Sequence, residues 1–223
     1  MILPCRGCLG PLGSGAQAGL CGRCWSGLAP LPEERCPRCA LAHGTCAGFR
    51  DWRRGDALWN YRAGRPPLGA LLVPAIKGGD LAWKGALLER TARAPLPDFA
   101  READLVCCAP TAWPRRWLRG FDLAEEAAAL IARRLHRPFR TLLRKAWLSR
   151  PQAGQAESRR RLLPAAAVTV RGGQSLAGVS VLVVDDVWTT GTTLRRCAQA
   201  LGRAGAADVS VLALFRVFTG DEV

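Results

Sequence analysis

The chain has 223 residues, 49% of them hydrophobic, so it is long enough for one mid-sized core with a small additional module and is not a low-complexity polymer. Lys and Arg number 32 against 18 Asp and Glu, a formal net charge of +14. Only Lys77, Lys84 and Lys145 are lysines, so the excess is almost entirely arginine. Two explanations stay open: a polyanionic partner such as nucleic acid, or the Arg-, Ala- and Gly-rich composition of a GC-rich genome.

The segments nearest to membrane or export signals are short. No stretch approaches the roughly 18 consecutive apolar residues of a membrane-spanning helix, and residues 70–76 contain Pro74 and end at Lys77. The first residues lack the basic region and apolar core of a secretory signal. We therefore expect a cytoplasmic protein with no membrane insertion.

Residues 1–52 form a Cys-rich module that we expect to precede a larger domain over residues 53–223. Two Cys-x2-Cys pairs, separated by twelve residues, have the spacing of a tetrahedral Zn²⁺ site formed by Cys5, Cys8, Cys21 and Cys24. A second set, Cys36, Cys39 and Cys46, has Phe49 where a fourth cysteine would complete it. This set binds a second metal with His43, packs without metal, or shares one ion with the first set.

The next predicted elements are a strand and a helix. Residues 104–110 are a short apolar run that ends at a proline, and residues 122–135 carry apolar side chains at helical spacing. Asp122 can cap this helix, with Glu125 completing a pair that resembles a capping box. The remaining cysteines, Cys107, Cys108 and Cys197, lie in apolar contexts, and we expect them in the core.

Three more elements follow in the last part of the chain. Residues 180–186 are typical of a buried strand, residues 192–205 of a helix with one apolar face, and residues 208–217 of another strand. Strands buried on both faces that alternate with helices predict an α/β fold with a doubly wound parallel sheet. Ligands of such sheets bind beyond the carboxyl ends of the strands, where Asp185 and Asp186 lie.

The strongest motif is VVDDVWTTGTT, from Val183 to Thr193. The start of the following helix offers backbone N–H groups and a positive dipole end to a phosphate, and four hydroxyls lie beside it, those of Thr189, Thr190, Thr192 and Thr193. Gly191 lets the backbone approach the anion closely. Because Asp185 and Asp186 can accept hydrogen bonds from vicinal hydroxyls, the motif suits a ribose 5-phosphate. The alternative is an ordinary strand-to-helix turn with capping threonines.

This motif resembles the binding loop of the type I phosphoribosyltransferases, in which two acids precede a TTGxT-like turn. The resemblance implies a parallel sheet with a variable hood, phosphoribosyl pyrophosphate with Mg²⁺ as the donor, and Asp185 and Asp186 as catalytic residues. It also implies a pyrophosphate-binding loop with Arg115, Arg116, Arg119 and Gly120. The alternative for this segment is a solvated basic loop without a ligand. Residues 150–164 fall where that family has a mobile loop over the active site.

Together with the Cys-rich module, these features resemble the ComF family, the competence-associated proteins of bacterial natural transformation, over about residues 5–217. The resemblance also rests on three short segments, Tyr61 to Gly64, Ile76 to Gly79 and Arg119 to Phe121. The chain departs from the family at Asp122, where Asn is more common, and at the missing cysteine of the second set. The family's link with competence implies a helicase partner.

These features predict a protein of DNA uptake that binds phosphoribosyl pyrophosphate, or a related ribose phosphate, and single-stranded DNA. Arginine would provide affinity for the DNA backbone, and eight tryptophans offer stacking surfaces for bases. The alternative is an active phosphoribosyltransferase of nucleotide salvage or metabolism. No acceptor pocket can be identified in the sequence.

Overall fold

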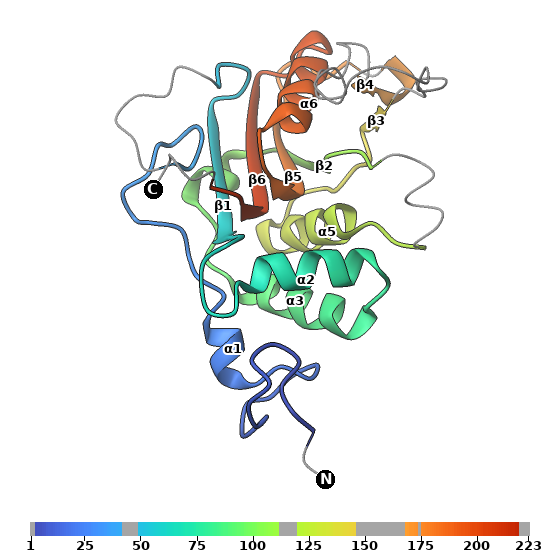
Figure 1. Cartoon of the computed structure of the whole chain (residues 1–223). Coiled ribbons are helices and arrows are strands. Elements are labelled where there is room, and N and C mark those ends of the chain that lie inside the picture. The colour runs from blue at the N-terminus through green and yellow to red at the C-terminus, as the bar shows by residue number, and fades with distance from the viewer. Residues whose placement is uncertain (1–2, 42–48, 112–119, 146–167, 174, 219–223) are drawn as a thin grey trace, which may run out of the picture.

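A four-stranded parallel sheet organises the chain in the computed structural model, which describes residues 3–41, 49–111, 120–145, 168–173 and 175–218 (Figure 1). The strand order is β1-β6-β5-β2. Their bounds are β1 Arg54–Asn60, β2 Leu105–Cys108, β5 Ser180–Trp188 and β6 Asp208–Arg216. All three pairings are parallel. All four carboxyl ends therefore lie at one edge of the sheet.

Helices cover both faces of this sheet (Figure 1). One face carries α2 Leu68–Lys77, α3 Leu81–Arg93 and α5 Leu123–Leu135, and the other carries α6 Thr192–Arg203. The smaller elements are α1 Gly22–Ser26, the 3-10 turns η1 Asp98–Glu102 and η4 Arg171–Gly173, and the antiparallel pair β3 Leu143–Lys145 and β4 Val168–Val170. Among the described residues, none of the helices is both long and apolar enough to span a lipid bilayer.

Strand β5 has alternate side chains in two separate cores. Leu182 and Val184 pack in the core under α2, α3 and α5, whereas Val181 and Val183 pack in the core under α6. Burial on both faces explains why β5 reads as a continuous apolar run in the sequence. The predicted parallel α/β fold is confirmed.

The predicted elements in the second half of the chain form close to their expected bounds. Asp122 caps α5 as expected, since its Oδ1 accepts hydrogen bonds from the N–H groups of Ala124 (3.1 Å) and Glu125 (3.4 Å). Cys107, Cys108 and Cys197 are buried, as predicted. The sequence analysis did not predict β1, α2 and α3. Asp56 interrupts the apolar run of β1, and Pro74 lies inside α2, so neither has a clear pattern.

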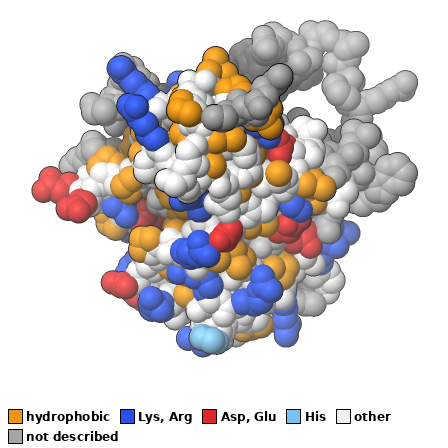
Figure 2. Space-filling model, turned by 90° about the horizontal axis from the view of Figure 1, so that it is seen from below, with side chains coloured by type: hydrophobic (Ala, Val, Ile, Leu, Met, Phe, Trp, Pro, Cys, Tyr) orange, Lys and Arg blue, Asp and Glu red, His pale blue; other side chains and the backbone are white. Residues whose placement is uncertain are grey.

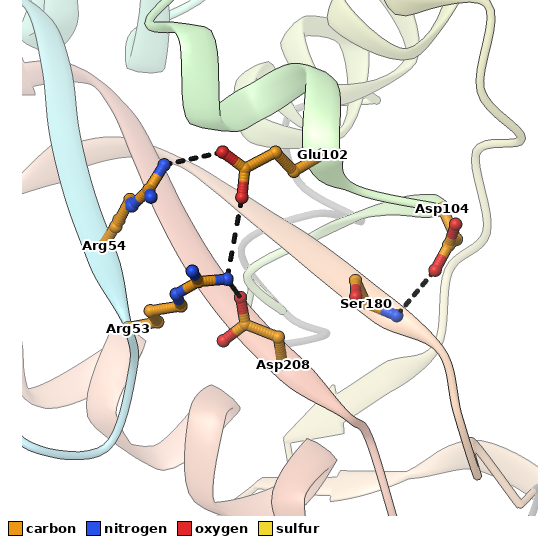
Figure 3. A network of polar contacts seen from close by, with 6 residues as sticks. All are labelled: Arg53, Arg54, Glu102, Asp104, Ser180 and Asp208. Atoms are coloured by element: carbon orange, nitrogen blue, oxygen red, sulfur yellow. Dashed lines mark hydrogen bonds and ion pairs between the residues drawn. The ribbon is translucent and has the colours of Figure 1, made fainter.

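An ion-pair network closes the amino edge of the sheet (Figure 3). At the start of β1, Arg54 contacts Glu102 at 2.7 Å, and Arg53 lies 3.4 Å from Asp208 of β6. These side chains neutralise one another across β1, η1 and β6, on the edge of the sheet opposite to the carboxyl ends of the strands.

The N-terminal residues pack against α3 rather than standing apart from the larger domain. The indole N–H of Trp83 donates to the Ala18 carbonyl at 2.8 Å, and the Arg90 guanidinium lies 4.4 Å from the centre of the Trp25 ring. Trp25 shares one hydrophobic core with residues of α2, α3 and α5. The division of the chain at residue 52 stays a prediction.

Candidate functional site

The loop between β5 and α6 forms a small hollow at the carboxyl edge of the sheet. Its volume is about 50 Å³, and its lining includes all of Thr189 to Thr193. The N-cap position of α6 is Gly191, at φ +73°, and it has no side chain to bond the first-turn N–H groups. The hydroxyls of Thr190 and Thr192 lie 3.0 Å apart across the loop. The arrangement leaves a helix N-terminus and its hydroxyls facing a space suited to an anion.

A larger cavity of about 170 Å³ adjoins this hollow. The two spaces share Asp185, Val187 and Thr193 in their linings. The cavity is also lined by Asp186, Lys77, Lys145, Phe121 and Asp122. Both predicted acids therefore lie beside the predicted phosphate loop, as their adjacency in the sequence requires.

The two acids differ in their surroundings. Burial, followed by the charge of Asp186, raises the pKa of the Asp185 carboxyl well above its ordinary value. Its Oδ1 accepts a hydrogen bond from the Asp186 N–H at 2.8 Å. Asp186 instead pairs with Lys77, whose Nζ lies 2.6 Å from Asp186 Oδ2. The pair thus combines one carboxyl that is harder to ionise with one that is neutralised by a lysine.

Sequence reasoning missed Lys77 and Lys145 as cavity residues. Lys77 is the last residue of α2 and Lys145 the last residue of β3, so both arrive from elements far from β5 in the chain. The third lysine, Lys84, lies 4.5 Å from the centre of the Phe121 ring, which lines the same cavity. The sequence offered one signal, the rarity of lysine in an arginine-rich chain: two of the three lysines line this cavity, and the third contacts a residue of its lining.

The N-terminus of α5 differs from that of α6. Its N–H groups already bond the carboxylate of Asp122, so this helix end holds an anion supplied by the chain itself. Gly120, the last predicted pyrophosphate-binding residue, has φ +70°. Arg115, Arg116 and Arg119 lie outside the described residues, as does the predicted mobile loop over residues 150–164.

The first two cysteine pairs converge. Among the described residues, they form one group of potential metal ligands, with the sulfurs of Cys5, Cys8, Cys21 and Cys24 all within 4.8 Å of one another. Cys5 Sγ lies 3.6 Å from Cys24 Sγ, and Cys8 Sγ lies 3.8 Å from Cys21 Sγ. Four sulfurs bound tetrahedrally at about 2.3 Å from one zinc ion would be about 3.8 Å apart. The cluster can hold a metal ion.

Backbone N–H groups favour the thiolate form of Cys5. Burial raises the pKa of this thiol, but N–H groups of Cys21, Cys8 and Gly7 outweigh it and lower the pKa to about 6. Two of these contacts are hydrogen bonds to Cys5 Sγ, from Cys21 at 3.2 Å and from Gly7 at 3.4 Å. A thiolate is the form of cysteine that binds metal.

The second cysteine set lies elsewhere. Cys39 is buried in the core under α6, with Cys36 packed against that core, whereas the first set borders the core under α2 and α3. The described residues therefore do not support one ion shared by pairs from both sets. Cys46 and His43 lie outside the described residues, so a second metal site stays a prediction.

Known proteins resemble this chain in part or over most of its length. Residues 123–221 match the family model "Phosphoribosyl transferase domain", which spans α5, β5, the threonine loop, α6 and β6. The chain is 30% identical over 233 residues to the DNA utilization protein YhgH of Escherichia coli O6:H1, covering 95% of this chain and 96% of that protein. The YhgH protein of Shigella flexneri has the same identity and coverage.

Among the solved structures that match part of this chain are those of two enzymes. The glutamine phosphoribosylpyrophosphate amidotransferase of B. subtilis is 25% identical, with a TM-score of 0.39, over 59% of this chain and 26% of that chain. The orotate phosphoribosyltransferase of Aeropyrum pernix is 22% identical, with a TM-score of 0.35, over 63% of each chain. This chain thus spans about a quarter of the length of the first enzyme.

Proposed function

This chain belongs to the family of the DNA utilization protein YhgH, and from that premise we propose that it acts in DNA uptake through a cavity that binds phosphoribosyl pyrophosphate or a related ribose phosphate. The 5-phosphate occupies the hollow of Thr189 to Thr193. The ribose hydroxyls donate to Asp185 and Asp186. The pyrophosphate lies towards Lys77, Lys145 and the arginines of residues 115–119.

One observation carries this proposal: the threonine hollow and the larger cavity are contiguous through Asp185, Val187 and Thr193. A phosphorylated pentose places an anionic phosphate next to a diol, so it needs a helix N-terminus next to acceptors. The α6 N-terminus provides the first and the acid pair provides the second. The N-terminus of α5 is already capped by Asp122, which supports the α6 N-terminus as the end of the site that binds the phosphate.

Two metals belong to this proposal. Mg²⁺ entering with pyrophosphate neutralises part of its negative charge, and carboxylate oxygens like those lining the cavity are the ligands that this ion prefers. Zn²⁺ is the ion we assign to Cys5, Cys8, Cys21 and Cys24, because four thiolates in a tetrahedron are typical of structural zinc sites. Such a site stabilises residues that have little core of their own.

The proposal also includes single-stranded DNA as a ligand, a competence helicase as a partner and the cytoplasm as the location. The name of the relatives, DNA utilization protein, and the net charge of +14 support the DNA ligand. Figure 2 shows Lys and Arg side chains spread over the face seen there, with carboxylates and apolar groups between them. On this face a strand would contact separate basic groups rather than one continuous stripe.

Calorimetric titration tests the ribose-phosphate site. Phosphoribosyl pyrophosphate with Mg²⁺, and ribose 5-phosphate alone, should each bind saturably to the full chain. Asp185→Asn with Asp186→Asn should weaken binding by roughly tenfold or more, since hydrogen bonds to charged groups contribute about 1.5 to 3 kcal/mol each. Asp98→Asn, which changes an exposed carboxylate, is the control. Unchanged affinity in the double variant contradicts the role of the acids.

The same proteins separate DNA handling from salvage chemistry. Transformation should fall in the double variant but not in Asp98→Asn. Release of pyrophosphate in the presence of a nucleobase would instead identify an active phosphoribosyltransferase. Affinity for single-stranded DNA should fall as the salt concentration rises. In a plot of the logarithm of the binding constant against the logarithm of the salt concentration, each contacted phosphate should make the slope more negative by about 0.7. Affinity that does not change with salt contradicts the DNA ligand.

A further inference from the structure

The turn from Lys77 to Asp80 has an ion pair at each end. Lys77 Nζ lies 2.6 Å from Asp186 Oδ2 in the candidate site. Asp80 Oδ2 lies 2.7 Å from Nη2 of Arg6, which stands between the first two cysteines of the metal-capable cluster. A segment of four residues therefore contacts both the cavity, through Lys77, and the cysteine module, through Arg6.

Hydrogen bonds hold this turn in one shape. The N–H groups of Gly78, Gly79 and Asp80 all donate to carbonyls of the last turn of α2, at 2.8 to 3.1 Å. Asp80 also begins α3, because its Oδ1 accepts from the Trp83 N–H at 2.9 Å. Since the turn is bonded to both helices, a displacement of Asp80 also displaces the end of α2, where Lys77 lies.

Arg6 is held in its turn by the folded cysteine module. Its guanidinium lies 4.1 Å from the centre of the Trp83 ring, and its backbone N–H donates to the Gly19 carbonyl at 2.9 Å. The Trp83 indole N–H donates to the neighbouring Ala18 carbonyl at 2.8 Å. The position of Arg6 therefore depends on the loop between the two cysteine pairs being folded.

We infer that Arg6 is a positioning residue for the cavity: through Asp80 and the turn it holds Lys77 against Asp186, so the cysteine module sets the arrangement of charges at the ribose-phosphate site. The side chains of Lys77 and Asp186 are 32% and 17% exposed, so their ion pair is partly desolvated and sensitive to position. The ligand-binding consequence rests on the proposed function, whereas the position of Lys77 does not.

The rarity of lysine permits a test without any ligand. In protein labelled selectively with ¹⁵N- and ¹³C-lysine, three side-chain signals are expected, and Lys77→Arg and Lys145→Arg assign two of them. Arg6→Gln and Asp80→Asn should both shift the Lys77 signal towards its position in Asp186→Asn, and should leave the Lys145 signal in place. Asparagine can still cap α3, so Asp80→Asn breaks the ion pair without removing the cap.

Arg54→Gln is the matched control, because it breaks an Arg–carboxylate pair of the same 2.7 Å length at the opposite edge of the sheet (Figure 3). It should move none of the three lysine signals. Metal content and thermal unfolding are measured for each variant, and if Arg6→Gln releases the metal, Asp80→Asn decides the question. A Lys77 signal that stays in place in Asp80→Asn overturns the inference.

A second measurement gives the consequence for the site. Affinity for ribose 5-phosphate should fall by about 3- to 10-fold in Arg6→Gln and in Asp80→Asn. In a Lys77→Gln background the same changes should have no further effect, because the residue they position is gone. If the wild-type chain does not bind ribose 5-phosphate while the Lys77 signal moves as expected, the proposed function fails and the positioning role stands. If Arg6→Gln and Asp80→Asn weaken binding equally in the presence and in the absence of Lys77, the positioning role is wrong, whereas the proposed function is unaffected.

Discussion

Arg216 Nη1 donates a hydrogen bond to the Thr189 carbonyl at 2.7 Å, which ties the end of β6 to the first threonine of the threonine loop, Thr189 to Thr193. The same nitrogen donates to the Trp188 carbonyl at 3.1 Å, and Nε donates to the Cys39 carbonyl at 3.2 Å. Arg216 is only 3% exposed, and its guanidinium lies 5.0 Å from the centre of the Trp188 ring. One buried cation therefore fixes the start of the loop, the end of β5 and the second cysteine segment together.

Replacing Arg216 by Met should lower the free energy of unfolding by about 3 kcal/mol, because several buried carbonyls lose their donor. The threonine loop should also become more mobile, with faster amide exchange in Thr189 to Thr193. Arg62→Met, at an exposed arginine, should change stability by less than about 0.5 kcal/mol. Equal unfolding midpoints for the two variants in urea would contradict the role of Arg216.

Gly191→Ala should destabilise the protein by about 2 kcal/mol or more and abolish binding of ribose 5-phosphate. The residue has φ +73°, and an added Cβ would lie 2.6 Å from Phe49 Cε1 and 2.9 Å from Trp188 Nε1. Gly202→Ala, within the same helix, has open space around it and should stabilise the protein by roughly 0.5 to 1 kcal/mol. Urea unfolding compares the two; destabilisation by both would refute this account of the loop.

Asp185→Asn should gain stability relative to wild type as the pH rises. Burial, and then the charge of Asp186, raises the pKa of this carboxyl in the folded protein, so its proton is held more tightly than in the unfolded chain. Its contribution to stability is complete below the unfolded pKa of about 3.9 and is lost as the pH rises through the folded pKa. Each tenfold difference in proton affinity is worth about 1.4 kcal/mol.

The measurement is urea unfolding of wild type, Asp185→Asn and Asp98→Asn between pH 4 and pH 8. Relative to wild type, the free energy of unfolding of Asp185→Asn should increase as the pH is raised from 4 towards 8. Asp98→Asn, which changes an exposed carboxyl, is the control for the loss of one negative charge. A difference that is the same at every pH for Asp185→Asn would show that this carboxyl is not perturbed.

Asp122→Asn should strengthen binding of phosphoribosyl pyrophosphate by about fivefold, because it removes a negative charge worth about 1 kcal/mol from the lining of the cavity. Stability should hardly change, since Asn and Asp are equally good caps. Asp122→Ala should bind as tightly but lose about 1 kcal/mol of stability with the cap. Weaker binding by Asp122→Asn would instead indicate that this carboxylate contacts the ligand directly or through Mg²⁺.

Protein purified without added zinc should contain at least one equivalent of zinc per chain. Cys21→Ser should lose it, and proteolysis should then cut within residues 3–31 while the parallel sheet stays folded. Cys36→Ser should still contain this zinc ion, because Cys36 lies outside the converging group of four cysteines. If the wild-type chain contains a second equivalent of zinc that is lost in Cys36→Ser but not in Cys21→Ser, a second site is established. Absence of metal, with all four thiols open to a thiol reagent, would exclude zinc.

Local patterns in the sequence were enough to predict β5, the threonine loop, α6 and the cap of α5. An apolar run, an acid pair, a glycine and a capping residue act within a few residues of one another, so their spacing identifies them in a single chain. The same reasoning predicted the cysteine cluster, since each Cys-x2-Cys pair is a local unit.

The contacts between distant segments could be seen only in the folded chain. Lys77 reaches Asp186, Arg6 reaches Asp80, and Arg216 reaches Thr189, although nothing near any of these residues in the sequence marks its partner. In a chain with 32 basic and 18 acidic residues, very many ion pairs are conceivable. Which of them form depends on how α2, α3 and the N-terminal residues pack against the sheet, because a charge contributes only at short distance and in the partly desolvated places that this packing creates.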